Sequence, residues 1–348
     1  MTAHPEALTR IARAALIGGL LATVAACSPS VPAATEVPSG PAATGATSRP
    51  AATSAATLAP ATPASPATTP PAGAPTGTVV AWGQNDHGQT TIPAGLTGAT
   101  AIAAGGYHVL ALMSDGTVVA WGYNQLHQAT VPVGLSSVTA ITAGHYHNLA
   151  LQSDGTVVAW GQNTYGQARV PADLSGVTAI AAGGYHNLVL RSDGTVYAWG
   201  LDTSGQATVP AGLSGVTAIA AGYLYSLALR SDGTVVAWGN DTYGQASVPA
   251  GLSRVTAIAA GNLHSLALKS DGTVVAWGSN QHGQAAVPAG LSGVTAIAAG
   301  DWHSLALKSD ATVVAWGDDA RGNTVPSGLS DVIATSGGLN FSVALVRN

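Results

Sequence analysis

The chain has 348 residues, of which only 8% are charged and 44 are glycine, so it is poor in charged helix formers and rich in turn formers. Removing the three Arg and two Glu of residues 1–76 leaves 8 basic and 14 acidic residues, a balance that argues against a nucleic-acid partner. A single cysteine excludes an intrachain disulfide.

Residues 1–26 are predicted to be a signal peptide. Arg10 and Arg13 precede an apolar stretch, 14–26, which is short for a bilayer span but fits a signal-peptide core. The stretch ends in Val-Ala-Ala-Cys27, which resembles the lipobox of bacterial lipoproteins. That resemblance implies lipidation of Cys27, export, and anchoring to the outer face of the cytoplasmic membrane or of another envelope membrane. The alternative is an ordinary signal peptide with a chance cysteine.

Residues 27–76 are predicted to be a disordered, Ala/Pro/Thr-rich stalk. Residues 28–76 contain 11 prolines among Ala, Thr, Ser and Gly, too little apolar surface to offset the entropy of ordering. Proline favours an extended chain of about 3.1 Å per residue, so the stalk would reach about 150 Å. Stalks of this composition occur with and without O-linked glycans, and both alternatives stay open.

Residues 77–348 contain a 39-residue repeat, which decides the fold class. Seven tryptophans follow this spacing, at 82, 121, 160, 199, 238, 277 and 316. Seven such periods fill the region with nothing left over. It is therefore predicted to be a single domain.

Each repeat is expected to supply four extended pieces. In the repeat that starts at Val177, these are 177–182, 187–191, 195–199 and a short piece ending at Pro210. Asp193-Gly194 favours a tight hairpin between the second and third pieces. Proline cannot donate to a sheet, so the fourth piece is expected to be a weak edge strand. The third piece is apolar on both faces, as in blades stacked around a ring.

The ends of the region indicate how the ring closes. The region begins with a third strand, 77–82, and finishes with a second strand, 342–346. These two strands are expected to complete one blade together. We therefore predict an all-β, seven-bladed β-propeller closed by its N- and C-terminal strands, preceded by a signal peptide and a disordered linker.

The repeat also carries a family resemblance. The string 179–200, and Gly-Gln shortly after Trp-Gly as at 166–167, resemble the repeat of the regulator-of-chromosome-condensation superfamily, which implies a seven-bladed propeller. The nucleotide-exchange role of its chromatin-bound founder is not expected in an acidic exported protein. The segment 205–210, Gly-Gln-Ala-Thr-Val-Pro, is similar to secreted actinobacterial propeller-type β-lactamase inhibitor proteins. In those proteins, aromatic loop residues on one face grip the enzyme.

Aromatic residues outside the periodic tryptophans gather in two kinds of turn that topology places on one face. Ten of the eleven lie there, Tyr225 and Phe341 included, and only Tyr197 lies in a strand. Tyr and Trp are enriched at binding hot spots. The predicted partner-binding residues are Tyr107, Tyr123, Tyr146, Tyr165, Tyr185, Tyr223, Tyr243 and Trp302. Among them Tyr165 and Tyr243 are expected to be the most exposed. The alternative is that these rings merely cover the ends of the core.

No catalytic, cofactor or metal site is predicted. Five of the seven repeats have a histidine at one position, and these histidines are too far apart to converge on one ion: His108, His147, His186, His264 and His303. Tyr225 and Phe341 hold this position in the other two repeats, so a packing role with a bond to a neighbouring backbone group is expected. The hairpin aspartates serve turn geometry. The predicted function is an anchored, monomeric binding module for an unidentified protein, such as a β-lactamase or a cell-wall enzyme. Two alternatives are a β-lactamase inhibitor and a binder of cell-wall polysaccharide, and contact with the membrane is expected through the lipid alone.

Overall fold

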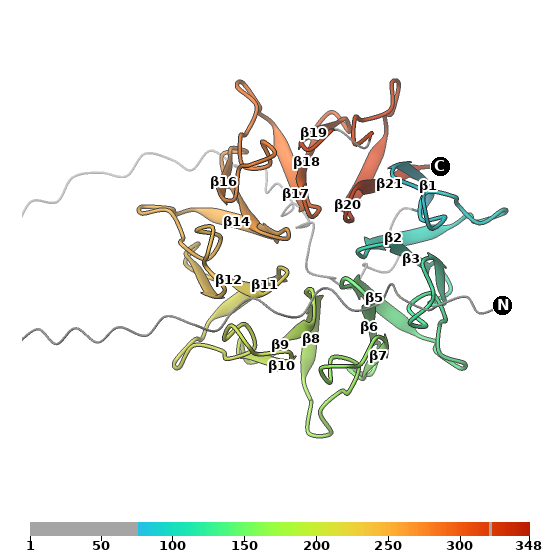
Figure 1. The fold of residues 1–348 in the computed structure, drawn as a ribbon, viewed down its shortest axis with the longest axis horizontal. Helices are drawn as coiled ribbons and strands as arrows, with labels where there is room; N and C mark the ends of the chain where they lie inside the picture. The colour runs from blue at the N-terminus through green and yellow to red at the C-terminus, as the bar shows by residue number, and fades with distance from the viewer. Residues whose placement is uncertain (1–75, 320–321) are drawn as a thin grey trace, which may run out of the picture. The chain divides into compact units, whose positions relative to one another are not determined.

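The structure is a computed structural model that describes residues 76–319 and 322–348 (Figure 1). The predicted signal peptide, Cys27 and nearly the whole predicted stalk lie outside the described residues. The regular elements of the described part are strands, and none of its segments forms a helix long and apolar enough to cross a membrane.

Twenty-one strands follow one another in groups of three. The strands nearest the centre of Figure 1 are β2 (Ala99–Ala104), β5 (Val138–Ala143), β8 (Val177–Ala182), β11 (Val216–Ala221), β14 (Val255–Ala260), β17 (Val294–Ala299) and β20 (Val332–Gly337). The middle strands are β3 (His108–Met113), β6 (His147–Gln152), β9 (His186–Arg191), β12 (Tyr225–Arg230), β15 (His264–Lys269), β18 (His303–Lys308) and β21 (Phe341–Arg347). The outer strands are β1 (Gly77–Gly83), β4 (Val118–Gly122), β7 (Val157–Gly161), β10 (Val196–Gly200), β13 (Val235–Gly239), β16 (Val274–Gly278) and β19 (Val313–Gly317).

These strands form an all-β, propeller-like fold of six or seven blades. Five sheets have three strands each, and the sixth has the order β20-β21-β1-β2-β3-β4. Within that sheet β1 pairs with β21 over seven residue pairs, from Gly77–Arg347 to Gly83–Phe341. In contrast, a single pair, Gly77–Ala99, joins β1 to β2. The predicted pairing of the first strand with the last is therefore confirmed.

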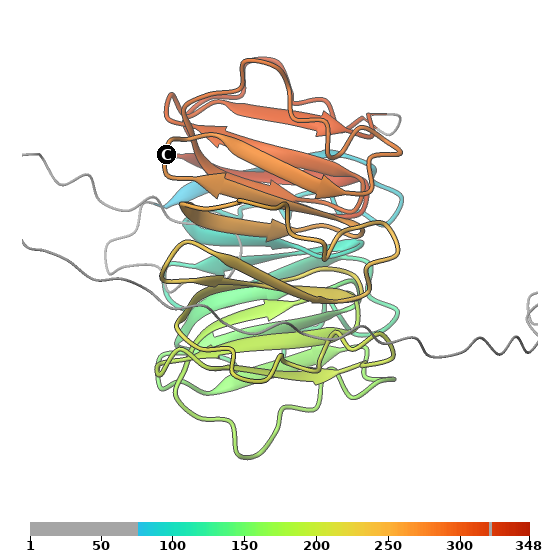
Figure 2. The same ribbon diagram turned by 90° about the vertical axis from the view of Figure 1, so that its left-hand side faces the viewer.

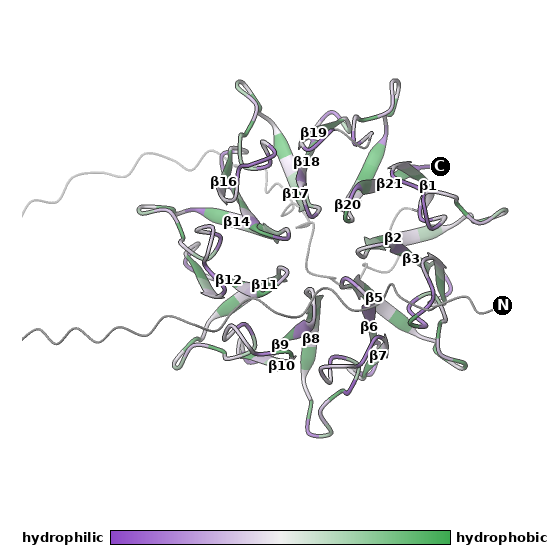
Figure 3. Cartoon of the chain, in the orientation of Figure 1, coloured by the Kyte–Doolittle hydropathy of each residue, from purple (hydrophilic) through white to green (hydrophobic). Residues whose placement is uncertain are grey.

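The hydrophobic core lies between neighbouring sheets. Leu188 and Leu190 of β9, for example, pack in one cluster with Ile219 of β11 and Trp238 of β13. Both sides of each sheet are covered in this way, which explains strands that are apolar on both faces (Figure 3). Each inner strand contacts the next, and β20 contacts both β17 and β2.

The predicted fourth strand is absent from the described repeats. In the segment that ends at Pro210, Thr208 N donates a hydrogen bond to Gly205 O at 3.1 Å and closes a turn. The proline has no N–H, so the segment cannot extend the ladder beyond β10. Each sheet unit consequently ends at its outer, tryptophan-bearing strand.

The turns alternate between two faces, as predicted (Figure 2). His108 pairs with Gly122, so the turn before β3 and the loop after β4 lie at the same end of the sheet. At the other end, Ser114 N in the β3–β4 hairpin donates to Gly98 O in the turn before β2. We call the first end, with its counterparts in the other repeats, the aromatic face, and the second the hairpin face.

Candidate functional site

The loops of the aromatic face rest on a buried set of hydrogen bonds between neighbouring blades, which we call the latch. His108 Nε2 lies 2.6 Å from Asn148 Oδ1 in the next blade, and Asn148 Nδ2 donates to Gln128 O. The same carbonyl accepts from the indole N–H of Trp160 at 3.1 Å. Later blades use a serine hydroxyl in place of the asparagine, as in the pair His264–Ser304. Where it is present, the latch thereby fixes the position of the loop relative to two blades.

The latch histidines are neutral because they are buried. Burial lowers the pKa of His108 and His147 to about 4 and that of His264 to about 3. Their Nδ1 atoms have no partner, so Nε2 carries the proton and donates it to the oxygen of the next blade. A Cβ at Gly105 would collide with the His108 ring, which explains the glycine at this turn.

The expectation that these histidines bond a backbone group is wrong, since their partner is a side chain. The ring at this position also varies with its partner. In the last repeat Phe341 replaces histidine, and it packs in one cluster with Val109, which stands where other blades have Asn or Ser. Within the described residues, no group of three or more His, Cys, Asp or Glu side chains is placed to hold a metal ion.

Two of the predicted binding tyrosines protrude from the aromatic face. Tyr165 is 46% exposed and Tyr243 is 44% exposed, in agreement with the expectation for the loop tips. The remaining six predicted residues are partly buried, namely Tyr107, Tyr123, Tyr146, Tyr185, Tyr223 and Trp302. Tyr225 and Phe341 are fully buried at the latch position, so counting them among the face aromatics is wrong.

Most of these rings form a continuous series, the aromatic arc. It starts at His87, whose ring lies 5.2 Å from that of Tyr107, and Tyr107 stacks on Tyr146 at 6.0 Å. Further ring contacts 4.8 to 6.4 Å apart complete the arc, which comprises His87, Tyr107, Tyr123, His145, Tyr146, Tyr165, Tyr185 and Tyr223. Tyr243 has no ring contact of this kind with the described residues, and Trp302 pairs separately with His282 at 5.2 Å. The two histidines of the arc, His87 and His145, are not among the residues predicted to bind the partner.

Another contact joins blades that are not neighbours. His145 Nε2 lies 2.8 Å from Asp301 Oδ2, and Asn262 Nδ2 donates to the same oxygen at 3.1 Å. All three residues directly follow the first glycine of their turns. Burial alone would lower the pKa of His145, but the charge of Asp301 and the hydrogen bond to it outweigh burial and raise that pKa. Nothing in the sequence analysis singled out this contact.

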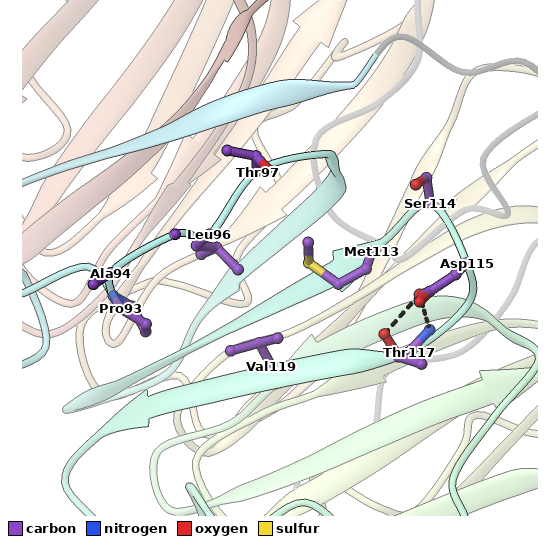
Figure 4. A pocket seen from close by; sticks show the side chains of 10 residues that line it. Pro93, Ala94, Leu96, Thr97, Met113, Ser114, Asp115, Thr117 and Val119 are labelled. Carbon is purple, nitrogen blue, oxygen red and sulfur yellow. Dashed lines mark hydrogen bonds between the residues drawn. The ribbon is translucent and has the colours of Figure 1, made fainter.

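A shallow pocket lies on the opposite side, at the hairpin face (Figure 4). It is lined by the 93–97 turn, by Met113 and by the β3–β4 hairpin. Its carboxylate, Asp115, accepts hydrogen bonds from Thr117 N at 2.9 Å and Thr117 Oγ1 at 2.6 Å. These bonds lower the pKa of Asp115. The carboxylate thus serves the turn, as the sequence predicted for the hairpin aspartates.

Comparison with known proteins identifies the repeat. The regulator of chromosome condensation (RCC1) repeat matches six segments of thirty residues, which together cover 180 of the 348 residues: 99–128, 138–167, 177–206, 216–245, 255–284 and 294–323. No curated protein matches the chain.

Several solved structures share the fold. Prp20p of Saccharomyces cerevisiae, whose binding to Gsp1p and histones has been described, is 21% identical with a TM-score of 0.66, covering 79% of this chain and 92% of that one. Human WBSCR16 is 21% identical with a TM-score of 0.65, covering 78% and 100%. The ectodomain of the Physcomitrella patens receptor kinase CR4 is 25% identical with a TM-score of 0.57, covering 69% of each chain.

Proposed function

Because the chain belongs to the RCC1 repeat family, we propose that it is a closed seven-bladed propeller that binds a protein partner through its aromatic face. Seven blades follow if the six-stranded sheet is divided at its single Gly77–Ala99 pair. Leu339 N, in the turn between β20 and β21, donates a hydrogen bond to Gly106 O, in the turn between β2 and β3, at 3.2 Å. This bond between the last and the first blade supports closure of the ring. RCC1-type propellers are protein-interaction modules, as the described binding of Prp20p to Gsp1p illustrates.

The observation that carries this proposal is the aromatic arc together with the exposed Tyr165 and Tyr243. Tyrosine and tryptophan supply large contact areas at a small cost in conformational entropy, and they dominate binding hot spots. The latch holds the loops that carry them, so little ordering is needed on binding. The hairpin face offers no comparable group of rings among the described residues.

The direction of β1 fits presentation of the aromatic face away from an anchor. β1 starts at Gly77, opposite Arg347 on the hairpin face, and ends at Gly83, opposite Phe341 on the aromatic face. Residue 76 and the C-terminus therefore both leave from the hairpin face. We propose that Cys27 is lipidated and that 27–76 is the stalk of an exported, monomeric protein, so that the opposite face is free. The fold is compatible with an extracellular setting, since the CR4 ectodomain shares it.

The test is replacement of Tyr165, Tyr243 and Trp302 together by Ala in the full chain. A partner found by affinity capture should then lose at least about a hundredfold in affinity, because truncation of two hot-spot residues costs that much or more. The matched control is Thr156, Thr195 and Thr234 to Ala on the hairpin face. Unchanged affinity in the first variant, or equal loss in both, would reject the aromatic face.

The two narrower alternatives have their own tests. Adding the purified protein to a panel of β-lactamases at micromolar concentration shows whether the partner is such an enzyme. A glycan array shows whether the rings instead stack on sugars of the cell wall. Inhibition or a glycan hit that persists in the tyrosine variant would place the site elsewhere on the molecule.

A further inference from the structure

The two faces differ in the balance of their charges. The aromatic face carries six aspartates, and among the described residues its only Lys or Arg is Arg169, which lies in the loop after β7 together with Tyr165. The other described basic residues lie at the hairpin end of the blades: Arg191, Arg230, Arg254, Lys269, Lys308 and Arg347. The aromatic face is thus both aromatic and strongly acidic.

Several basic side chains of the hairpin face have an acidic or aromatic partner. Lys308 Nζ lies 2.7 Å from Asp310 Oδ2, and the guanidinium of Arg191 lies 5.1 Å from the centre of the Tyr197 ring. On the aromatic face, the described partners of Asp202 and Asp241 are backbone amides and hydroxyls. Their negative charges are therefore not neutralised by a basic side chain of the described chain.

The fold does not need those two negative charges. Asp202 Oδ1 accepts a hydrogen bond from Ala207 N, and Asp241 Oδ1 accepts one from Ala246 N. At the same position of four other repeats an asparagine accepts the equivalent bond through its side-chain oxygen: Asn85, Asn124, Asn163 and Asn280. A neutral amide would thus hold the loop equally well. Three repeats nevertheless carry a carboxylate here, Asp202, Asp241 and Asp319, and the first two belong to adjacent blades.

The two carboxylates belong to the same run of three successive loops as the two exposed tyrosines. Tyr165 and Tyr243 are at the tips of the loops after β7 and β13. Asp241 belongs to the same loop as Tyr243, and Asp202 belongs to the loop between them, whose tip is the small Ser204. Aromatic rings attract cations to their faces, and carboxylates pair with them. Spread over three neighbouring loops, these groups match a segment that bears Lys or Arg side chains.

Resting on the proposed function, we propose that the partner presents a cationic, Lys- or Arg-bearing segment to this sector of the aromatic face, between the loops that follow β7 and β13. Charge complementarity selects such a segment over an acidic or neutral one. The sector lies opposite the hairpin face, from which both described chain ends leave.

The experiment measures binding of a short peptide of alternating Lys and Gly to the full-length protein. The double variant D202N/D241N should bind it about tenfold more weakly, the sum of two exposed charge pairs. Binding by the parent protein should also weaken as salt is raised, because exposed pairs are screened. The matched control is D193N/D232N, which removes the same two charges from hairpins of the same two blades.

Three outcomes would overturn the inference. Equal weakening in both double variants would mean that binding follows net charge alone. Equal binding of the peptide with Glu in place of Lys would mean that charge does not select. Salt-independent binding of a chitin oligosaccharide in place of the peptide would indicate a glycan site.

A failure of this inference can be told apart from a failure of the proposed function. One possible result is that the captured partner no longer binds the variant with Tyr165, Tyr243 and Trp302 replaced by Ala but still binds D202N/D241N. The aromatic face would then bind a protein, but not through a cationic segment. If all variants retain the partner, the proposed face itself is wrong.

Discussion

The aromatic face and the hairpin face are built from the same repeat but vary to different degrees. In all six described hairpins an aspartate accepts a hydrogen bond from a threonine N–H two residues later, as in Asp193–Thr195. On the aromatic face, the backbone N–H at each described loop tip donates to the buried glutamine of the loop, but the side chains differ: His87, Leu126, Tyr165, Ser204, Tyr243 and His282. Where equivalent positions of the repeats keep the same residue type, that residue therefore serves the fold. Where the residue type differs between repeats, the side chain is available for recognition.

Truncating a tryptophan that recurs in every repeat should destabilise the fold far more than truncating one that does not recur. Trp277 is 7% exposed, and its indole N–H donates to Gln245 O at 2.9 Å. Trp277→Ala should lower the free energy of unfolding by about 3–5 kcal/mol, the usual cost of emptying a buried aromatic site. Trp302→Ala makes the same chemical change on the aromatic face and should cost about 1 kcal/mol. Denaturant unfolding of both variants measures the difference, and similar losses would contradict the comparison.

The latch should make the protein sensitive to acid. An unfolded histidine titrates near 6.5, whereas burial lowers the pKa of His264 to about 3. Between these values the unfolded chain binds more protons, so stability is lost as the pH falls from about 6.5 towards 3. Each latch histidine contributes up to about 3–5 kcal/mol to that loss, because one pKa unit corresponds to about 1.4 kcal/mol. Thermal unfolding as a function of pH measures it.

A double variant that copies the Phe341–Val109 pair tests the origin of this sensitivity. His264→Phe with Ser304→Val should retain a stability at pH 7 close to that of the parent and lose less of it in acid, because one titrating group has been removed. An unchanged pH dependence would show that the buried histidines do not control acid unfolding.

His145 should respond to pH in the opposite direction. Because Asp301 raises the pKa of His145, its contribution is fully present below about pH 6.5 and is lost as the pH rises through the folded value. We expect about 1 kcal/mol from the pair at pH 6. A double-mutant cycle of His145→Gln and Asp301→Asn at pH 6 and pH 8 measures it. Coupling that grows with pH would contradict the sign.

The smallest expected effect concerns Asp202 and Asp241. Replacing both by Asn should change the free energy of unfolding by less than about 0.5 kcal/mol, because asparagine accepts the same bond in four other repeats. Asp202→Ala is the control and should cost about 1 kcal/mol, since it leaves Ala207 N without its acceptor. A large loss in the Asn variant would mean that the carboxylates serve the fold.

Much of the fold could be predicted from periodicity. The expected strand 177–182 coincides with β8, and the expected terminal strands coincide within one residue with β1 and β21. The fourth strand was wrong because composition does not reveal that the amides of Ala207 and Thr208 donate within the loop, to Asp202 Oδ1 and Gly205 O. Local pattern therefore predicted the strands better than the segments between them.

Less of the candidate site could be predicted. The exposure of Tyr165 and Tyr243 followed from their loop-tip positions, whereas the burial of Tyr225 depends on its place in the histidine series. The contact between His145 and Asp301 joins residues 156 positions apart with no repeat counterpart, so no spacing rule indicates it. The one available signal was the residue that follows the first glycine of this turn. It is a second glycine in two repeats, after Gly105 and Gly183, but a histidine or an aspartate at His145 and Asp301.

The pairing of β1 with β21 also bears on mechanics. Tension applied at residue 76 while a partner holds the aromatic face would pull β1 lengthwise along β21. Interstrand hydrogen bonds lie perpendicular to the strands, so such a force loads all seven residue pairs at once instead of opening them one after another. A tether attached at the start of β1 would load the β1–β21 hydrogen bonds in shear, so that they resist the force together. A tether attached at a hairpin tip would instead separate the strands of its blade one pair at a time.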